Sequence, residues 1–222
     1  MRPQFDLRLY LLIDPEHCHD RHPAEIAAAA VRGGATLVQY RDKRNTTRDQ
    51  VRLAHHVMEA CAASAVPLLI NDWVDVALAV KADGVHLGRD DMPVERARAI
   101  LGDTAIIGGT VHFPEEADAI DPSMVDYVGL GPVFATSSKT ANDPALGVGG
   151  LGSLLGYWRK VAPGVPACGI SGINQSNAAD VLTSGVEGIA VISAIGMADD
   201  VEAATRDLRR VVDAAVTGDQ AA

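Results

Sequence analysis

The chain alternates eight times between a short apolar run and a longer stretch whose apolar residues recur at helical spacing. Each run is nearly continuous in its apolar character, which is typical of parallel strands buried on both faces. The expected strands are residues 9–13, 36–39, 68–70, 84–86, 105–107, 127–129, 165–167 and 188–191. The expected helices begin near residues 23, 48, 74, 93, 114, 149, 176 and 199.

Eight such alternations in 222 residues predict an α/β fold, a (β/α)8 or TIM barrel. We expect a single domain over residues 1–222, with residues 217–222 as a frayed tail. A doubly wound open sheet is the alternative, but it normally has a glycine-rich turn after its first strand. Here that turn reads Asp14-Pro15-Glu16-His17. Because a barrel gathers its reacting groups where the strands end, polar residues just after the runs are the candidates for function.

Local signals support several of the helices. Prolines that suit a first helical turn are Pro23, Pro93 and Pro114. The expected N-caps are Thr47, Asn71 or Asp72, Ser176 and Asp199. The glycines expected to end helices in a left-handed conformation are Gly33, Gly34, Gly102 and Gly185.

Composition excludes several classes of function. A formal charge of −10, without a basic run, argues against non-specific binding of nucleic acid. No apolar run reaches membrane-spanning length and the first residues lack the apolar region of a signal peptide, so we expect no membrane partner and a cytoplasmic protein. Cys18, Cys61 and Cys168 are odd in number and far apart, which indicates neither a disulfide framework nor a zinc site.

The first polar cluster follows the second expected strand and reads Gln39-Tyr40-Arg41-Asp42-Lys43. Residues two apart on an extended chain share a face, so Gln39, Arg41 and Lys43 are expected to point together toward the barrel mouth. An arginine fork beside a mobile lysine suits a di- or polyphosphate. The alternative is structural, with the two cations paired to Asp42 and Asp72. Spacing alone leaves both open.

A second cluster joins Asn71 and Asp72, after the third expected strand, to Asp91, after the fourth. Asp72 and Asp91 come from neighbouring strands and can share one hard cation, most simply Mg²⁺ completed by water and phosphate oxygens. The alternative is that these residues only cap the helices that follow them. The anion site at Arg41 and Lys43 favours the metal, because two carboxylates on one metal call for a polyanionic partner.

The remaining strand ends carry hydroxyls, a lysine and glycines. Thr110 follows the fifth strand, and the loop of residues 131–140 holds Lys139 among several hydroxyls, as expected of a loop that closes over a phosphate. Gly172 and Ser193 follow the seventh and eighth strands, where many barrels bind a phosphate through backbone N–H groups. The mouth is therefore expected to hold two phosphate-bearing ligands.

Taken in order, these segments resemble the thiamine-phosphate synthase family. The matching stretches are QYRDK (39–43), IND (70–72), ADGVHLG (82–88) with Asp91, GGTVH (108–112), DYVGLGPVF (126–134) with Thr136 and Lys139, and GIAVISAI (188–195). Each is weak alone, but in this order they are highly specific. The resemblance implies a transferase of thiamine biosynthesis that joins 4-amino-5-hydroxymethyl-2-methylpyrimidine diphosphate to a thiazole phosphate, forming thiamine phosphate and pyrophosphate.

The resemblance also implies residue roles. Contacts to the pyrimidine diphosphate would come from Gln39, Tyr40, Arg41, Asp42, Lys43, Asn71, Thr110 and Lys139, with Arg41, Lys43, Thr110 and Lys139 as the catalytic contacts. Contacts to the thiazole phosphate would come from Thr136, Ser137, Ser138, Gly172, Ile192 and Ser193. Asp72 and Asp91 would hold Mg²⁺. The implied reaction is dissociative: metal and cations neutralise the departing pyrophosphate, and the thiazole nitrogen captures the carbocation left on the aminopyrimidine.

Three positions depart from the family's usual pattern. Thr110 stands where serine is common, Ser138 where threonine is common, and Ser171 where a second glycine is common. The first two keep a hydroxyl. Ser171 would narrow the thiazole-phosphate site or adopt a backbone angle that costs serine about 1 kcal/mol or more, and we expect activity to survive.

Three rival functions remain. A thiazole tautomerase-like paralogue of the same fold would not need Arg41, Lys43 and the aspartate pair. A sugar-phosphate isomerase or lyase would want a strand-end acid, base or Schiff-base lysine. A noncatalytic phosphate-ligand-binding barrel would bind without releasing pyrophosphate. The sequence also leaves open whether the chain forms a homodimer, and whether His86 is a general base or a hydrogen-bonded core residue.

Overall fold

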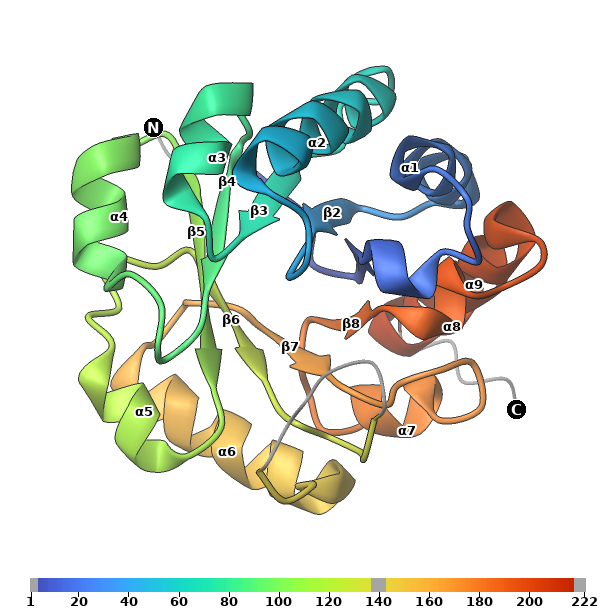
Figure 1. Ribbon diagram of the computed structural model, residues 1–222. Coiled ribbons are helices and arrows are strands. Elements are labelled where there is room, and N and C mark those ends of the chain that lie inside the picture. Colours follow the sequence, from blue (N-terminus) through green and yellow to red (C-terminus); the bar gives the residue numbers. More distant parts are fainter. Residues whose placement is uncertain (1–3, 137–142, 218–222) are drawn as a thin grey trace.

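The computed structural model describes residues 4–136 and 143–217. The strands form a closed parallel barrel in sequence order, in which β1 also pairs with β8 (Figure 1). They are β1 (Leu9–Ile13), β2 (Leu37–Tyr40), β3 (Leu68–Asn71), β4 (Gly84–Leu87), β5 (Ile106–Val111), β6 (Tyr127–Leu130), β7 (Ala167–Ile170) and β8 (Gly188–Val191). The expected (β/α)8 barrel is confirmed.

Helices surround the barrel and connect one strand to the next (Figure 1). They are α1 (Pro23–Gly33), α2 (Thr47–Ala62), α3 (Val74–Val80), α4 (Val94–Leu101), α5 (Pro114–Ala119), α6 (Gly147–Val161), α7 (Ala178–Leu182), α8 (Ser193–Gly196) and α9 (Val201–Thr217). A 3₁₀ helix, η1 (Pro15–His17), follows β1. The short helices α8 and η1 were not expected. Residues 218–222 of the expected frayed tail lie outside the described part of the chain.

Two apolar layers hold the barrel together. The outer layer lies between strands and helices and includes Val38, Tyr40 and Trp158. The inner layer fills the barrel and includes Tyr10 and Tyr127. Side chains alternate between the two layers along each strand. This alternation decides which polar residues face the barrel interior.

Strands β1 and β8 have their expected bounds, β2, β3, β4 and β6 differ from theirs by one residue at one or both ends, and β5 and β7 differ by more. Strand β7 was expected at residues 165–167 but begins at Ala167, because Val165 belongs to the turn in which its N–H bonds to the Ala162 carbonyl. Strand β5 was expected to end at residue 107 but continues through two glycines, which are poor strand formers in isolation. Packing explains the first of them, since a Cβ at Gly108 would lie 2.2 Å from the ring of Tyr127.

Helix ends follow their expected chemistry only in part: α3 and α7 begin without a side-chain cap, and Pro93 is the N-cap of α4 rather than a residue of its first turn. The N-cap residues of α2, α3 and α7 are Thr46, Trp73 and Asn177, and Asp200 accepts from an N–H in the first turn of α9. These replace the expected Thr47, Asn71 or Asp72, Ser176 and Asp199. Left-handed glycines are found as expected at Gly34, Gly102 and Gly185, but not at Gly33, which lies within α1.

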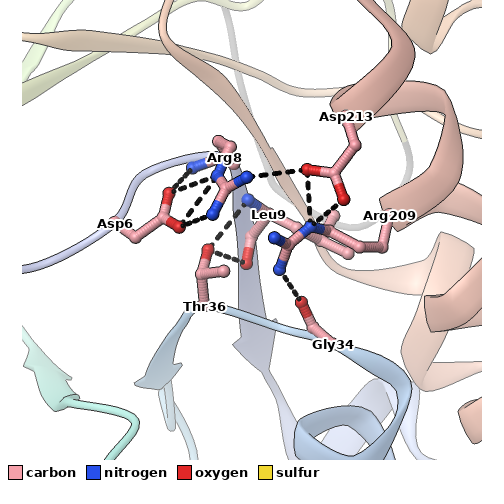
Figure 2. A network of polar contacts seen from close by, with 7 residues as sticks. All are labelled: Asp6, Arg8, Leu9, Gly34, Thr36, Arg209 and Asp213. Carbon is pink, nitrogen blue, oxygen red and sulfur yellow. Dashed lines mark hydrogen bonds and ion pairs between the residues drawn. The ribbon is translucent and has the colours of Figure 1, made fainter. Parts of the chain in front are cut away.

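A polar network ties the amino-terminal end of the barrel to α9 (Figure 2). Arg8 donates to Asp6, at 2.6 Å from its Nη2, and to Asp213 of α9, at 2.8 Å from its Nη1. Arg209 donates to the same Asp213 and, at 2.9 Å, to the carbonyl of Gly34. The network therefore joins the entry to β1, the end of α1 and the last helix.

We expect Arg8→Ala to lower the free energy of unfolding by about 1 kcal/mol, since the side chains are partly exposed but act as a network. Burial disfavours the charged form of Asp6, but the hydrogen bonds and charge of Arg8 outweigh it and lower the pKa of Asp6. The stabilisation is thus present at neutral pH and lost as the pH falls through the carboxyl range. Urea denaturation at several pH values measures this, with Arg210→Ala, whose exposed guanidinium pairs with Asp207, as the control. An equal loss in both variants would contradict it.

Within the described residues, no helix has both the length and the apolar character required to cross a membrane. The cysteines Cys18, Cys61 and Cys168 are buried and free.

Candidate active site

Arg41 lies just beyond β2 at the carboxyl end of the barrel and is only 8% exposed. Its Nη1 donates to the carboxylate of Asp14, which follows β1 and is 2% exposed. This buried partner balances the charge of Arg41 and holds its guanidinium in place. The Nε of Arg41 has no hydrogen-bond partner among the described residues. Sequence reasoning missed Asp14, although its position directly after the neighbouring strand was the available signal.

The other residues of the first cluster separate into two groups. Lys43 is half-exposed at the mouth and forms an ion pair with Asp72, as the structural alternative proposed. Asp42 instead organises the turn: it accepts from the Tyr40 hydroxyl at 2.7 Å and from the backbone N–H groups of Arg44 and Asn45. The side chains of Tyr40 and Asp42 therefore support the turn that carries Arg41 and Lys43.

Asp72 and Asp91 meet at the mouth, as their neighbouring strands predicted. Asp72 has a φ of +62°, a left-handed conformation that aspartate tolerates better than most residues. One Oδ of Asp91 accepts from the Gly88 N–H at 2.7 Å. Burial, together with the hydrogen bond and negative charge of Asp72, raises the pKa of Asp91 to about 6.

These two carboxylates suit a hard divalent cation. Their mutual repulsion is what a cation would relieve, and carboxylate oxygen is the donor type that Mg²⁺ prefers. Neither caps a helix: α3 and α4 begin without a side-chain cap. Within residues 4–136 and 143–217 there is no group of three or more acidic, histidine or cysteine ligands, so water or substrate oxygens would complete the shell.

Three residues of the candidate site carry buried polar groups, two of which lack a partner among the described residues. The Oε1 of Gln39 and the Nδ2 of Asn71 are buried and lack a partner within the described part of the chain. Thr110, near the end of β5, is buried and bonds through its hydroxyl to the Nε2 of His86 at 2.8 Å. Buried polar groups without partners are rare in folded proteins. Their presence here indicates that a polar ligand completes them.

A cavity of about 330 Å³ lies beyond β7 and β8. Its lining includes Thr136, Gly172, Ile192 and Ser193, four of the residues expected to contact a phosphate. Ser193 begins α8, and the first N–H groups of a helix have no partner within it. The cavity therefore offers amides, hydroxyls and a glycine to an anion. The expected contacts Ser137, Ser138 and Lys139 lie outside the described residues.

Ser171 adopts the strained backbone that its departure from the family pattern implied. Its φ is +83°, and the next residue, Gly172, has a φ of +67°. Side chains rarely occupy this region, and serine there costs on the order of 1 kcal/mol. Both residues line the 330 Å³ cavity. The strain therefore lies at the candidate site.

We expect Ser171→Gly to raise the free energy of unfolding by about 0.5–1 kcal/mol, because relief of strain exceeds the added entropy of glycine in the unfolded chain. Denaturant titration measures the change. Lys81→Gly is the matched control, since Lys81 has a φ of +56° at the end of α3 and does not line the cavity. A loss of stability in Ser171→Gly alongside a gain in Lys81→Gly would show that the serine side chain contributes contacts that outweigh its strain.

Comparison with known proteins identifies the family of this chain. The family model described as thiamine monophosphate synthase matches residues 9–195. The chain is 45% identical over 204 residues to the thiamine-phosphate synthase of Clostridium novyi, covering 92% of this chain and 98% of that protein. It is 44% identical over 207 residues to that of Chloroflexus aurantiacus, covering 93% of each.

A solved structure has a similar fold. The thiamine phosphate pyrophosphorylase of Pyrococcus furiosus superposes with a TM-score of 0.83 at 37% identity, over 95% of this chain and 97% of that one. The family match spans all eight strands, including those that carry Arg41, Asp72, Asp91 and Gly172. The chain belongs to the thiamine monophosphate synthase family.

Proposed function

We propose that this transferase joins 4-amino-5-hydroxymethyl-2-methylpyrimidine diphosphate to a thiazole phosphate, forming thiamine phosphate and pyrophosphate. The observation that carries the proposal is the pair Asp72 and Asp91, which meet across neighbouring strands with Lys43 bound to one of them. A carboxylate pair with a cation beside it is the arrangement that a metal-bound diphosphate requires. A tautomerase or a monophosphate-binding barrel gives no reason for it.

The diphosphate half of the site comprises cations and the aspartate pair. Arg41, held by Asp14, and Lys43 would contact diphosphate oxygens, and Lys139 would join them from the loop before α6. Asp72 and Asp91 would hold Mg²⁺, which when bound neutralises negative charge on the diphosphate. Because Asp72 would then face the metal, Lys43 would exchange its carboxylate partner for a phosphate.

The thiazole half would occupy the cavity beyond β7 and β8. Its phosphate would meet the hydroxyls of Thr136, Ser137, Ser138 and Ser193 and the amides at Gly172, Ile192 and Ser193, in a space of about 330 Å³. Binding through amides suits a monophosphate, which carries less charge than a diphosphate. Two anions with different partners are thus held at one mouth.

The chemistry is a substitution at the methylene carbon of the pyrimidine. The carbon–oxygen bond to the diphosphate breaks with its electron pair on the departing oxygen, and the lone pair of the thiazole nitrogen forms the new carbon–nitrogen bond. The cations stabilise the leaving charge, and Gln39, Asn71 and Thr110 orient the aminopyrimidine that carries the transient positive charge. No protein nucleophile is needed.

Pyrophosphate release by the purified protein tests the proposal, with each substrate alone and both together, with and without Mg²⁺. We expect release only with both substrates and the metal. Lys43→Gln is expected to lower kcat/KM about 10²-fold, while Lys160→Gln, an exposed lysine at the end of α6, is expected to leave it unchanged. Binding of the thiazole phosphate without release under any condition would refute the synthase function and favour a binding protein or a tautomerase.

A further inference from the structure

Five polar side chains form a continuous chain across the interior of the barrel. The Nε2 of Gln39 donates to the hydroxyl of Tyr10, which lies 2.7 Å from the hydroxyl of Tyr127. That hydroxyl lies 2.9 Å from the Nδ1 of His86, whose Nε2 lies 2.8 Å from the hydroxyl of Thr110. All five residues are buried. We call them the interior chain; its two ends, Gln39 and Thr110, are residues of the candidate active site.

Gly108 makes room for the interior chain, whereas a Cβ at Gly129 would be in ordinary contact with it. The strand register places Gly108 between His86 and Tyr127 on the inner face. A Cβ there would lie 2.4 Å from the hydroxyl oxygen of Tyr127, and one at Gly129 would lie 3.6 Å from the His86 ring. The interior therefore accommodates two phenols and an imidazole in mutual contact.

The hydrogen bonds of the interior chain all donate in one direction, from Gln39 toward Thr110. A buried hydroxyl proton needs an acceptor. Because Gln39 donates to Tyr10, the proton of Tyr10 is directed to Tyr127, and that of Tyr127 to the Nδ1 of His86. A neutral imidazole that accepts at one nitrogen donates from the other. The Nε2–H of His86 therefore points to Thr110, and the proton of Thr110 is left to point onward.

We propose that Tyr10, Tyr127 and His86 are positioning residues that set the hydrogen-bonding roles at the two ends of the interior chain, leaving the Oε1 of Gln39 as an acceptor and the hydroxyl of Thr110 as a donor toward the ligand. The unpaired Oε1 of Gln39 and the unpaired Nδ2 of Asn71 agree with this pattern within the described residues. A site with one acceptor, the Oε1 of Gln39, and donors from Thr110 and Asn71 is complementary to the amidine edge of an aminopyrimidine. On that edge an exocyclic NH₂ donates and the adjoining ring nitrogen accepts. A 4-oxopyrimidine has the opposite pattern on this edge, with a carbonyl that accepts and an adjoining ring N–H that donates. The ligand assignment rests on the proposed function, whereas the direction of the chain does not.

The tautomer of His86 tests the direction without any substrate. In uniformly ¹⁵N-labelled full-length protein, we expect a bare Nδ1 and a protonated Nε2 at neutral pH, with the signals assigned by their loss in His86→Gln. Tyr127→Phe removes the donor to Nδ1 and is expected to shift that nitrogen, whereas Tyr157→Phe, whose hydroxyl bonds to Asp118 on the surface, is expected to shift neither. A protonated Nδ1, whether in the other tautomer or in an imidazolium, would overturn the proposal.

Binding of two pyrimidine diphosphates tests the consequence at the ligand. We expect wild-type protein to bind the 4-amino compound more tightly than its 4-oxo analogue. Tyr127→Phe is expected to reduce the amino-to-oxo affinity ratio by about tenfold, because the hydrogen bonds on each side of residue 127 can then reverse their donor direction. His86→Gln keeps a donor near the position of Nε2, and is expected to retain more of the ratio than His86→Asn, which does not reach Thr110. Thiazole phosphate binding should be unchanged in all of them.

The two proposals fail in different ways. An unchanged amino-to-oxo ratio in Tyr127→Phe, in protein that still releases pyrophosphate, would overturn the role of the interior chain and leave the synthase intact. If the protein showed the expected His86 tautomer and the expected amino-to-oxo affinity ratio but released no pyrophosphate, the synthase function would be overturned and the role of the interior chain would stand. A ratio reduced equally by Tyr157→Phe would mark the effect as nonspecific and overturn the positioning role.

Discussion

Replacing either carboxylate of the pair, as in Asp72→Asn or Asp91→Asn, is expected to lower kcat/KM for the pyrimidine diphosphate roughly 10³-fold. The amide keeps the shape of the side chain and removes the charge that would bind a cation. The backbone N–H of Gly88 can still donate to the amide oxygen at residue 91, so the loop keeps its support. Steady-state kinetics over a range of Mg²⁺ concentrations measures the loss.

Asp90→Asn is the matched control for this prediction. Asp90 adjoins Asp91 in sequence, but its side chain is 89% exposed and pairs with Arg89 at 3.7 Å. We expect its kcat/KM to be unchanged. Asp91→Asn should also unfold at a temperature no lower than wild type, because it relieves the repulsion that raises the pKa of Asp91. Near-wild-type activity in Asp91→Asn would exclude the pair as a metal site.

The second large effect is expected at Gly172. Its φ is +67°, and a Cβ would lie 2.7 Å from the carbonyl oxygen of Ala135 and 2.7 Å from the Cβ of Phe134. Gly172→Ala therefore combines backbone strain with a clash that only backbone movement can relieve. We expect a loss of about 2–4 kcal/mol in the free energy of unfolding. Because the movement would occur in the lining of the cavity, we expect a thiazole-phosphate KM raised by about 10²-fold.

Gly164→Ala separates these two contributions. Gly164 has a φ of +89°, and a Cβ there would meet nothing within 4 Å. Its substitution should cost about 1 kcal/mol, from strain alone, and leave the thiazole-phosphate KM unchanged. Calorimetric unfolding and initial rates at saturating pyrimidine diphosphate provide the measurements. Equal losses of stability in the two variants would mean that the contacts at Gly172 relax freely.

Much of the active site could be predicted because a parallel barrel converts sequence order into spatial order. Asp72 and Asp91 each follow a strand, and consecutive strands are neighbours, so the two carboxylates had to meet at one end. The same reasoning brought Gly172 and Ser193 to one cavity. For Ser171, the departure from the family's second glycine left two alternatives, a narrower site or a costly backbone angle, and the φ of +83° shows the second. The predictions for the aspartate pair and for the cavity needed only strand positions.

Partners within the site could not be predicted in the same way. Arg41 was expected to choose between a ligand and Asp42, but its buried partner is Asp14, because Asp42 is occupied by backbone N–H groups of its own turn. Helix caps differed for a similar reason: Thr46 caps α2 in place of Thr47, Asp200 bonds in the first turn of α9 in place of Asp199, and α3 and α7 have no side-chain cap. Which of several nearby residues becomes the partner depends on backbone and side-chain torsion angles, and the spacing of residues along the sequence does not give these angles.

The sequence by itself determined the number and order of the strands, the end of the barrel at which the candidate site lies and the two carboxylates that meet there. The strands and helices are indicated by local patterns of apolar residues, which can be read from short stretches of sequence. Only the tertiary structure decided the interior chain, because Tyr10, Tyr127 and His86 come from three strands and meet only once the barrel closes at a particular register. Contacts across a barrel depend on which residues share a layer, and that is a property of the closed sheet as a whole.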